Sequence, residues 1–215
     1  MIRLLCLAMG YAFGLFQTAY FLGKSKGIDI RTQGSGNAGT TNTLRVLGTK
    51  AGLIVFVGDV LKCFLVCMIT RFAIMPKYPD LGYLLILYTA AGAILGHNFP
   101  FYMNFKGGKG MACTAGMIHA FHWTFLPVGW AVFLGIFLTT HYVSLGSLTV
   151  YVVLLLQLII EGQLGVFGLS QPVLIEMYVI MALLAALCFY QHRTNIVRLA
   201  KGEERKTYLS KKNQK

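Results

Sequence analysis

Long apolar runs are the feature that most restricts how this chain can fold. Several of them approach 20 residues, the length at which an α-helix crosses the roughly 30 Å hydrocarbon core of a bilayer. Of 215 residues, 56% are hydrophobic and 12% are charged, which is too apolar for a soluble domain of this size. The sequence therefore predicts an all-α polytopic membrane protein.

We predict seven membrane-spanning helices, with six as the alternative. The predicted spans lie near residues 3–23, 51–73, 81–98, 110–122, 125–140, 144–161 and 173–192. Residues 110–140 are nearly continuous and apolar, but Pro127 interrupts them and neither half is a full span. A helix that stops part-way through a bilayer is tolerated only where its end is buried in protein or lines a cavity. The prediction is therefore a bundle in which some helices are short or broken.

The placement of lysine and arginine predicts the orientation of this bundle. With seven spans and a cytoplasmic C-terminus, the inner side holds residues 24–50, 99–109, 141–143 and the tail 193–215. These segments carry five, two, none and eight Lys or Arg residues, fifteen in all. The outer side keeps Arg3, Arg71 and Lys77. Because basic residues are retained in the cytoplasm, we expect an outside N-terminus and a single integral-membrane domain over residues 1–215.

The net charge of +12 does not by itself indicate nucleic-acid binding. In a membrane protein it indicates cytoplasmic loops and contact with anionic membrane lipids. The charge is not gathered into a folded basic domain, so we expect no nucleic-acid partner. Cys63 and Cys67 lie one helical turn apart, which is neither a disulfide nor a zinc pattern.

Residues 34–48 form a polar, glycine-rich stretch between apolar runs. Its turn-forming glycines are Gly34, Gly36 and Gly39. Asn37, Thr41 and Arg45 follow at steps of four, which places them on one face of a helix. Backbone N–H groups, hydroxyls and an arginine at a helix start are the parts of a phosphate site. The alternative is a polar interhelical loop with a capped helix.

A second polar segment, residues 105–110, places two lysines around two glycines directly before a helix. We expect the backbone N–H groups of Gly107 and Gly108 to be exposed to an anion, with Lys109 adding a point charge. The segment is not a Walker A loop, because Gly110 follows Lys109 where Ser or Thr is required. The nearby His97 is predicted to be an interfacial or hydrogen-bonded histidine.

A third polar segment follows the last predicted span. His192, Asn195 and Arg198 recur every three residues and stay near one face of a helix. Residues 201–206 and the basic tail after them are expected to be solvated and close to lipid headgroups.

Two further pairs have structural and functional interpretations. Asp59 and Lys62, three residues apart in an apolar run, can form an ion pair on one helix face. His119 and His122 could begin a metal site, but no Cys or carboxylate accompanies them in the sequence, so we expect interface residues and no metal.

The residue types restrict the chemistry. No Ser–His–Asp arrangement can be nominated, and no histidine is followed by Asp five positions later, which excludes the His-x-x-x-x-Asp acyltransferase signature. The Asp-rich motif of membrane phosphoalcohol transferases is also absent. Three donor-rich segments on one membrane face, with few bases, suit a phosphorylated substrate and an already activated donor.

Three motifs together resemble those of the bacterial acyl-phosphate:glycerol-3-phosphate acyltransferases, the PlsY family, over nearly the whole chain. They are Gly34-Ser35-Gly36-Asn37 with Gly39, Thr41, Asn42 and Arg45; Gly96-His97 with Phe105 to Gly110; and His192, Asn195-Ile196, Arg198-Leu199, Gly202 and Glu204. The resemblance implies a seven-helix inner-membrane enzyme of phospholipid biosynthesis with its site facing the cytoplasm. It implies acyl transfer from acyl phosphate to the 1-hydroxyl of glycerol 3-phosphate, giving lysophosphatidic acid and phosphate without a cofactor or metal. It leaves open a contact with the enzyme that produces acyl phosphate.

Carried over by motif, the resemblance implies a role for each matching residue. Ser35 and Arg45 would hold a substrate phosphate, Lys109 would bind phosphate and the developing oxyanion, and His192 and Asn195 would orient the glycerol end. With no protein base in reach, a substrate phosphate would help to take the hydroxyl proton. Supporting or substrate-binding roles would fall to Asn37, Thr41, Asn42, Gly107, Gly108, Gly110, Ser144, Arg198 and Glu204.

Cys63, Cys113 and Gln191 depart from the family's usual residues at positions peripheral to this chemistry. Two other functions stay open from the sequence: a permease for a phosphorylated solute, and a non-catalytic paralogue or lipid-assembly scaffold. A permease would need a polar path to both faces.

Overall fold

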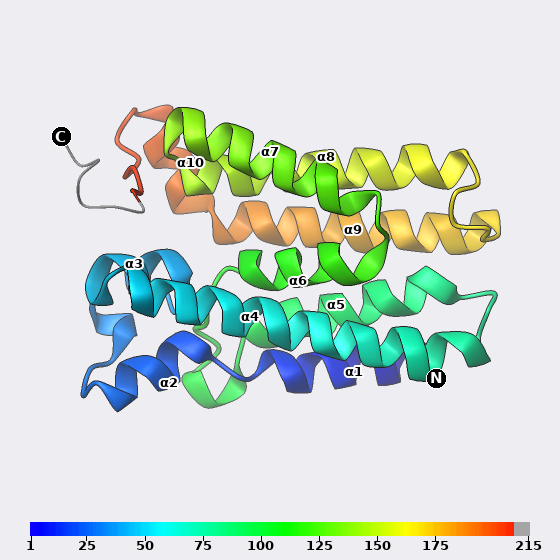
Figure 1. Ribbon diagram of the computed structural model, residues 1–215, viewed down its shortest axis with the longest axis horizontal. Helices are drawn as coiled ribbons and strands as arrows, with labels where there is room; N and C mark the ends of the chain where they lie inside the picture. The colour runs from blue at the N-terminus through cyan, green and yellow to red at the C-terminus, as the bar shows by residue number, and fades with distance from the viewer. Residues whose placement is uncertain (209–215) are drawn as a thin grey trace.

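The computed structural model describes residues 1–208, and its regular elements are helices (Figure 1). In chain order the α-helices are α1 (Ile2–Gly14), α2 (Thr18–Ser25), α3 (Thr40–Leu47), α4 (Thr49–Ile69), α5 (Gly82–Asn98), α6 (Met111–Phe121), α7 (Phe125–Thr140), α8 (Val143–Gln163), α9 (Gln171–Gln191) and α10 (Arg193–Ala200). No strand occurs within these residues. The predicted all-α fold class is confirmed.

Every predicted apolar run contains a helix, but the runs differ in length. Five helical segments are long and apolar enough to cross a membrane: Ile2–Ser25, Thr49–Lys77, Gly82–Met103, Val143–Gln163 and Gln171–Gln191. The helices α6 and α7 are shorter, as expected for residues 110–140. The number of crossings, seven or six, therefore stays a prediction.

The first predicted span, 3–23, is broken in the middle. Helix α1 ends at Gly14 and α2 begins at Thr18, with the buried Gln17 extended between them. The Gln17 Nε2 atom donates to the carbonyl oxygens of Gly14, Gly96 and His97 at 3.1–3.3 Å. A single amide therefore pairs the carbonyl groups of Gly14 and Gly96, which the break and the end of α5 would otherwise leave without partners inside the bundle, and gives the His97 carbonyl a second donor.

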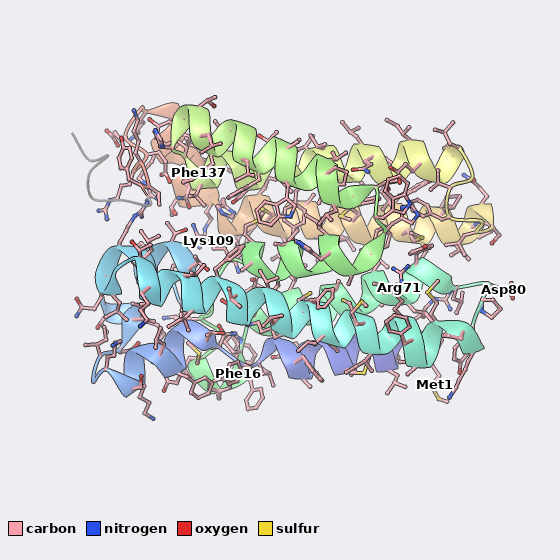
Figure 2. All side chains as sticks on the ribbon, in the orientation of Figure 1. Met1, Phe16, Arg71, Asp80, Lys109 and Phe137 are labelled. Carbon is pink, nitrogen blue, oxygen red and sulfur yellow. The ribbon has the colours of Figure 1, made fainter. Side chains whose placement is uncertain are left out.

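Helices α6 and α7 form a hairpin that turns back before the far ends of α8 and α9 (Figure 1). The end of α6 is paired by Arg71, whose Nη1 atom donates to the carbonyl oxygens of Ala120 and Phe121 at 3.0 Å each. Figure 2 shows Arg71 close to this turn. The expectation that a short helix must end inside protein is met here, because Phe121 is buried.

Glycines allow α1 and α5 to pack with their backbones in close contact. A Cβ atom on Gly10 would lie 2.0 Å from the Thr89 carbonyl oxygen, and one on Gly92 would lie 2.1 Å from the Leu7 carbonyl oxygen. Gly14 and Gly96 make equivalent approaches one turn further along. Small residues at this spacing are the usual means by which membrane helices approach closely, because lipid supplies no hydrophobic drive for association.

The bundle places its polar segments at one end. In Figure 1, α3, α10 and the beginning of α6 lie at the same end, and the N-terminus lies at the other. Apolar side chains of α4, α5, α6, α8 and α9 form one buried cluster behind them. Packing of these apolar helices therefore holds the three polar segments of the sequence together at one end of the bundle.

We expect Gly92→Ala to lower the melting temperature in detergent by about 5 °C. Overpacking costs about 1–3 kcal/mol, and each kcal/mol shifts the midpoint of a chain of this size by about 2–4 °C. The matched control is Gly135→Ala in α7, where nothing lies within 4 Å of the added Cβ atom. The control should melt at or slightly above the wild-type temperature, since alanine is the better helix former. Equal melting of the two variants would contradict the packing described for α1 and α5.

Candidate active site

The three polar segments surround one cavity of about 120 Å³ at the end of the bundle where Lys109 lies (Figure 2). Twelve of the fourteen residues predicted from the sequence line it: Ser35, Asn37, Thr41, Asn42, Arg45, Lys109, Gly110, Ser144, His192, Asn195, Arg198 and Glu204. The two that do not are Gly107 and Gly108. Residues from five separate parts of the chain thus share one wall.

The loop before α3 is held in shape by the buried Asn42. Its Oδ1 atom accepts from the backbone N–H of Ser35 at 2.7 Å, and its Nδ2 atom donates to the carbonyl oxygens of Ile30 and Gln33. Gly34 has a φ of +62°, and a Cβ atom there would lie 2.3 Å from Asn42 Oδ1. Asn42 therefore shapes the pocket, as expected, while the Ser35 side chain is exposed beside the cavity.

Two helix N-termini face the cavity. Residues Gly39 to Asn42 at the start of α3 and Gly110 to Ala112 at the start of α6 lie along its wall. The first N–H groups of an α-helix have no partner within the helix and carry a partial positive charge. These two helix starts therefore favour an anion in the cavity.

The expected role of Gly107 and Gly108 is wrong. Their N–H groups are not exposed to an anion, because they donate to the carbonyl oxygens of Asn98 and His97 at 3.1 Å. A Cβ atom on Gly107 would lie 2.0 Å from the His97 carbonyl oxygen, and one on Gly108 would lie 2.1 Å from His97 Nε2. These glycines let the loop pack directly on the end of α5, which fixes the position of Lys109.

Glu204 connects the second and third polar segments. Its Oε1 atom accepts from Asn195 Nδ2 at 2.7 Å and from Ser144 Oγ at 2.9 Å, and its Oε2 atom accepts from Arg198 Nε at 2.8 Å. Lys109 Nζ donates to Asn195 Oδ1, which completes a chain from the ammonium to the carboxylate. Burial alone would raise the pKa of Glu204, but its three donors outweigh burial and hold the pKa below its usual value.

Lys109 is a partly buried cation in the wall of the cavity. Burial, together with the positive charge of Arg198, lowers the pKa of Lys109 to about 8. The amine is therefore mostly charged at neutral pH, and an anion beside it would favour the charged form further. Such a group can pair with a phosphate or with developing negative charge.

His192 has one ring nitrogen committed to the fold. Its Nδ1 atom lies 2.8 Å from the carbonyl oxygen of Cys188, which can only accept, so Nδ1 carries the proton. In the neutral ring, Nε2 is then an acceptor. His192 lines the cavity, so this acceptor suits a substrate hydroxyl.

The segment after α10 crosses back over the site. Arg45 Nη2 donates to Thr207 Oγ1 at 2.8 Å and to the Arg205 carbonyl oxygen at 3.2 Å, and Thr207 N donates to the His141 carbonyl oxygen. Lys201 and Lys206 are exposed, as expected for a solvated tail, but Thr207 is buried. The expectation of a solvated tail is therefore wrong for Thr207, and residues 209–215 lie outside the described part of the chain.

The predicted ion pair of Asp59 and Lys62 is confirmed, with Nζ and Oδ1 2.9 Å apart. Lys62 Nζ also contacts His97 Nδ1 at 2.9 Å and donates to the Phe16 carbonyl oxygen at 2.6 Å. Asp59 and His97 both line the cavity. The sequence did not predict that Asp59 would line the cavity. It also did not single out Thr40, Ser147, Arg205 or Thr207, which line the cavity as well.

A second, apolar groove of about 430 Å³ continues from the cavity between α4, α6, α7 and α8. Both spaces are lined by Thr40, Thr41, Met111, Ala112, Val143 and Thr207, which we call the junction. Below the junction the walls are apolar side chains such as Leu53, Phe56 and Phe133. The arrangement joins a cationic polar cavity to a groove suited to a hydrocarbon chain.

Comparison with known proteins agrees with this arrangement. A family model described as Glycerol-3-phosphate acyltransferase matches residues 4–202. A glycerol-3-phosphate acyltransferase of Clostridioides difficile is 37% identical over 203 residues, which cover 92% of each chain. One from Thermotoga petrophila is 38% identical over 207 residues, covering 95% of this chain and 96% of the relative.

Solved structures give the same result. The crystal structure of PlsY, an integral membrane glycerol 3-phosphate acyltransferase, in its glycerol 3-phosphate form is similar with a TM-score of 0.82 and 32% identity, over 96% of both chains. Its lysophosphatidic acid form is similar with a TM-score of 0.79. The chain therefore belongs to the glycerol-3-phosphate acyltransferase family, and within it to the PlsY type of integral membrane enzyme.

Proposed function

We propose that this enzyme transfers a fatty acyl group from acyl phosphate to the 1-hydroxyl of glycerol 3-phosphate. The products are lysophosphatidic acid and inorganic phosphate, and the reaction takes place at the cytoplasmic face of the inner membrane. The observation that carries this proposal is the junction, where a cationic cavity meets an apolar groove. An acyl phosphate has the same division between a charged head and a hydrocarbon chain.

Different residues bind the different parts of the two substrates. Ser35 and Arg45 hold one phosphate, and Lys109 with the start of α6 holds the other and stabilises the oxyanion. His192 and Asn195 orient the glycerol. The acyl chain lies in the apolar groove, so its carbonyl carbon falls at the junction.

The step itself moves one acyl group and one proton. The 1-hydroxyl oxygen bonds to the carbonyl carbon, the bond from that carbon to the phosphate oxygen breaks, and the hydroxyl proton passes to phosphate. Two nearby carboxylates are poor candidates for the base, because Asp59 is paired with Lys62 and Glu204 accepts from three donors. This supports proton transfer to a substrate phosphate.

The decisive experiment supplies purified protein with glycerol 3-phosphate and one of three donors: acyl phosphate, acyl-CoA or acyl carrier protein thioester. We expect lysophosphatidic acid from acyl phosphate alone. Product formed from acyl-CoA but not from acyl phosphate would show that the donor is misassigned while the family activity stands.

We expect Lys109→Ala to lower kcat about 10²–10³-fold, the usual loss when one preorganised donor to an oxyanion is removed. The matched control is Lys106→Ala on the same loop, because Lys106 is exposed and does not line the cavity. The control should keep wild-type kcat. A Lys109→Ala variant with kcat within about threefold of the wild-type value would remove Lys109 from the site.

The wild-type enzyme should also depend on pH through Lys109. Its kcat/KM should fall as the pH rises through about 8, since the charged amine is lost there.

We also propose that the N-terminus is outside and that residues 24–50, 99–109, 141–143 and 193–215 face the cytoplasm. The fifteen inner against three outer basic residues support this orientation. In a Cys-free background, a cysteine at the exposed Thr32 should react with a membrane-impermeant reagent only after the inner face is opened. A cysteine at the exposed Gln171 should react in intact cells. Labelling of Thr32 from outside would reverse the proposed sidedness.

A further inference from the structure

The apolar groove extends over a similar length on four of the helices that line it. Measured from the junction end, its lining runs from Thr49 to Phe56 on α4 and from Val143 to Val150 on α8. On α6 it runs from Met111 to His119, and on α7 from Phe137 to Trp130 and the adjacent Gly129. Eight or nine residues are seven or eight steps along a helix, which correspond to about 10–12 Å at 1.5 Å per step. The groove therefore has a defined end.

A polar aromatic pair stands at this end. Trp130 Nε1 lies 3.3 Å from His119 Nε2, and His119 Nδ1 lies 2.7 Å from the Ala115 carbonyl oxygen. An indole N–H only donates and a carbonyl only accepts, so His119 donates through Nδ1 and accepts through Nε2. Both ring nitrogens have partners, and the two rings meet edge to face with centroids 5.8 Å apart. The pair is therefore a bridge between α6 and α7.

Beside the pair, the two helices are already in contact. A Cβ atom on Gly129 would lie 2.9 Å from Ile118 Cδ1. The two helices therefore pack closely at Gly129 and Ile118, and α6 itself ends at Phe121. A chain that follows the groove from the junction meets the paired rings.

We infer that the His119–Trp130 pair ends the part of the groove that the acyl chain follows and so limits how many of its carbons the protein contacts. The inference rests on the proposed function, because it needs an acyl chain in the groove. Each C–C bond of about 1.5 Å advances an extended chain by about 1.3 Å, so the 12 Å from Met111 to His119 holds about ten carbons. Carbons beyond that point must leave past the rings.

The route left to those carbons leads to lipid. Leu53 and Leu134 line the groove and are 60% and 39% exposed, so one side of the groove is open to the surrounding bilayer. Methylenes in that position exchange one apolar environment for another and add little affinity. The wild type should therefore distinguish weakly among chains longer than about ten carbons.

The test is a competition between decanoyl phosphate and hexadecanoyl phosphate in one nanodisc preparation, with glycerol 3-phosphate as acceptor. The ratio of the two lysophosphatidic acids is measured by mass spectrometry. Dividing the ratio for a variant by that for the wild type cancels the unequal partitioning of the donors. Trp130→Ala should raise the hexadecanoyl share about twofold or more, because further methylenes then gain close-packed contacts with the protein in place of lipid.

The chain supplies a matched control. Trp123, at the turn between α6 and α7, is 77% exposed and does not line the groove, so Trp123→Ala should keep the wild-type ratio. Trp130→Phe keeps an aromatic ring without the N–H and should also stay close to wild type. Ala115→Leu adds a larger side chain to the groove on the junction side of the pair. It should shift the ratio toward the decanoyl product, which tests the inference without removing the pair.

The outcomes separate this inference from the proposed function. Active Trp130→Ala and Ala115→Leu enzymes with the wild-type ratio would overturn the role of the pair while leaving acyl transfer intact. A wild type that forms no product from either acyl phosphate would instead overturn the proposed donor. If Trp130→Ala does not fold, Ala115→Leu decides: a shift toward decanoyl supports the inference, and an unchanged ratio overturns it.

Discussion

The requirement to pair backbone polar groups inside lipid governs where this bundle can be irregular. The first predicted span breaks only where Gln17 supplies an amide to three carbonyl oxygens. The short helix α6 ends where Arg71 donates to its last carbonyls. Both irregularities are tolerated because a side chain inside the bundle supplies donors to the carbonyl groups at the helix ends.

The site depends on cations that are held before any substrate arrives. Glu204 orients Arg198 and Asn195, and Asn195 in turn contacts Lys109. The glycine pair at 107–108 anchors the other side of Lys109 on the end of α5. Preorganised charge of this kind is the main way in which an enzyme stabilises developing negative charge without reorganisation. It fits the proposed transfer, in which the acyl group is already activated and the protein contributes position and charge.

The junction explains how one site can serve a charged metabolite and a lipid. Thr40, Thr41 and Thr207 stand where the polar wall changes to an apolar one, and the groove below lies between four helices. A water-soluble acceptor can reach the cavity from the end of the bundle, while a hydrocarbon chain stays at membrane depth. In the proposed reaction, the polar cavity and the apolar groove both hold the substrate that carries the reacting carbon, which favours its alignment.

The sequence by itself determined the fold class, the pairing of Asp59 with Lys62, and twelve of the residues that line the cavity. The fold class and the ion pair follow from apolar length and helical spacing. Several of the cavity residues, such as Ser144 and Glu204, follow from the resemblance of three motifs to those of a known family. The direction of the Gly107 and Gly108 N–H groups, the return of Thr207 over Arg45, and the groove that ends at Trp130 were decided only by the tertiary structure. Each depends on which distant residues pack together, and helical periodicity within one segment carries no information about that packing.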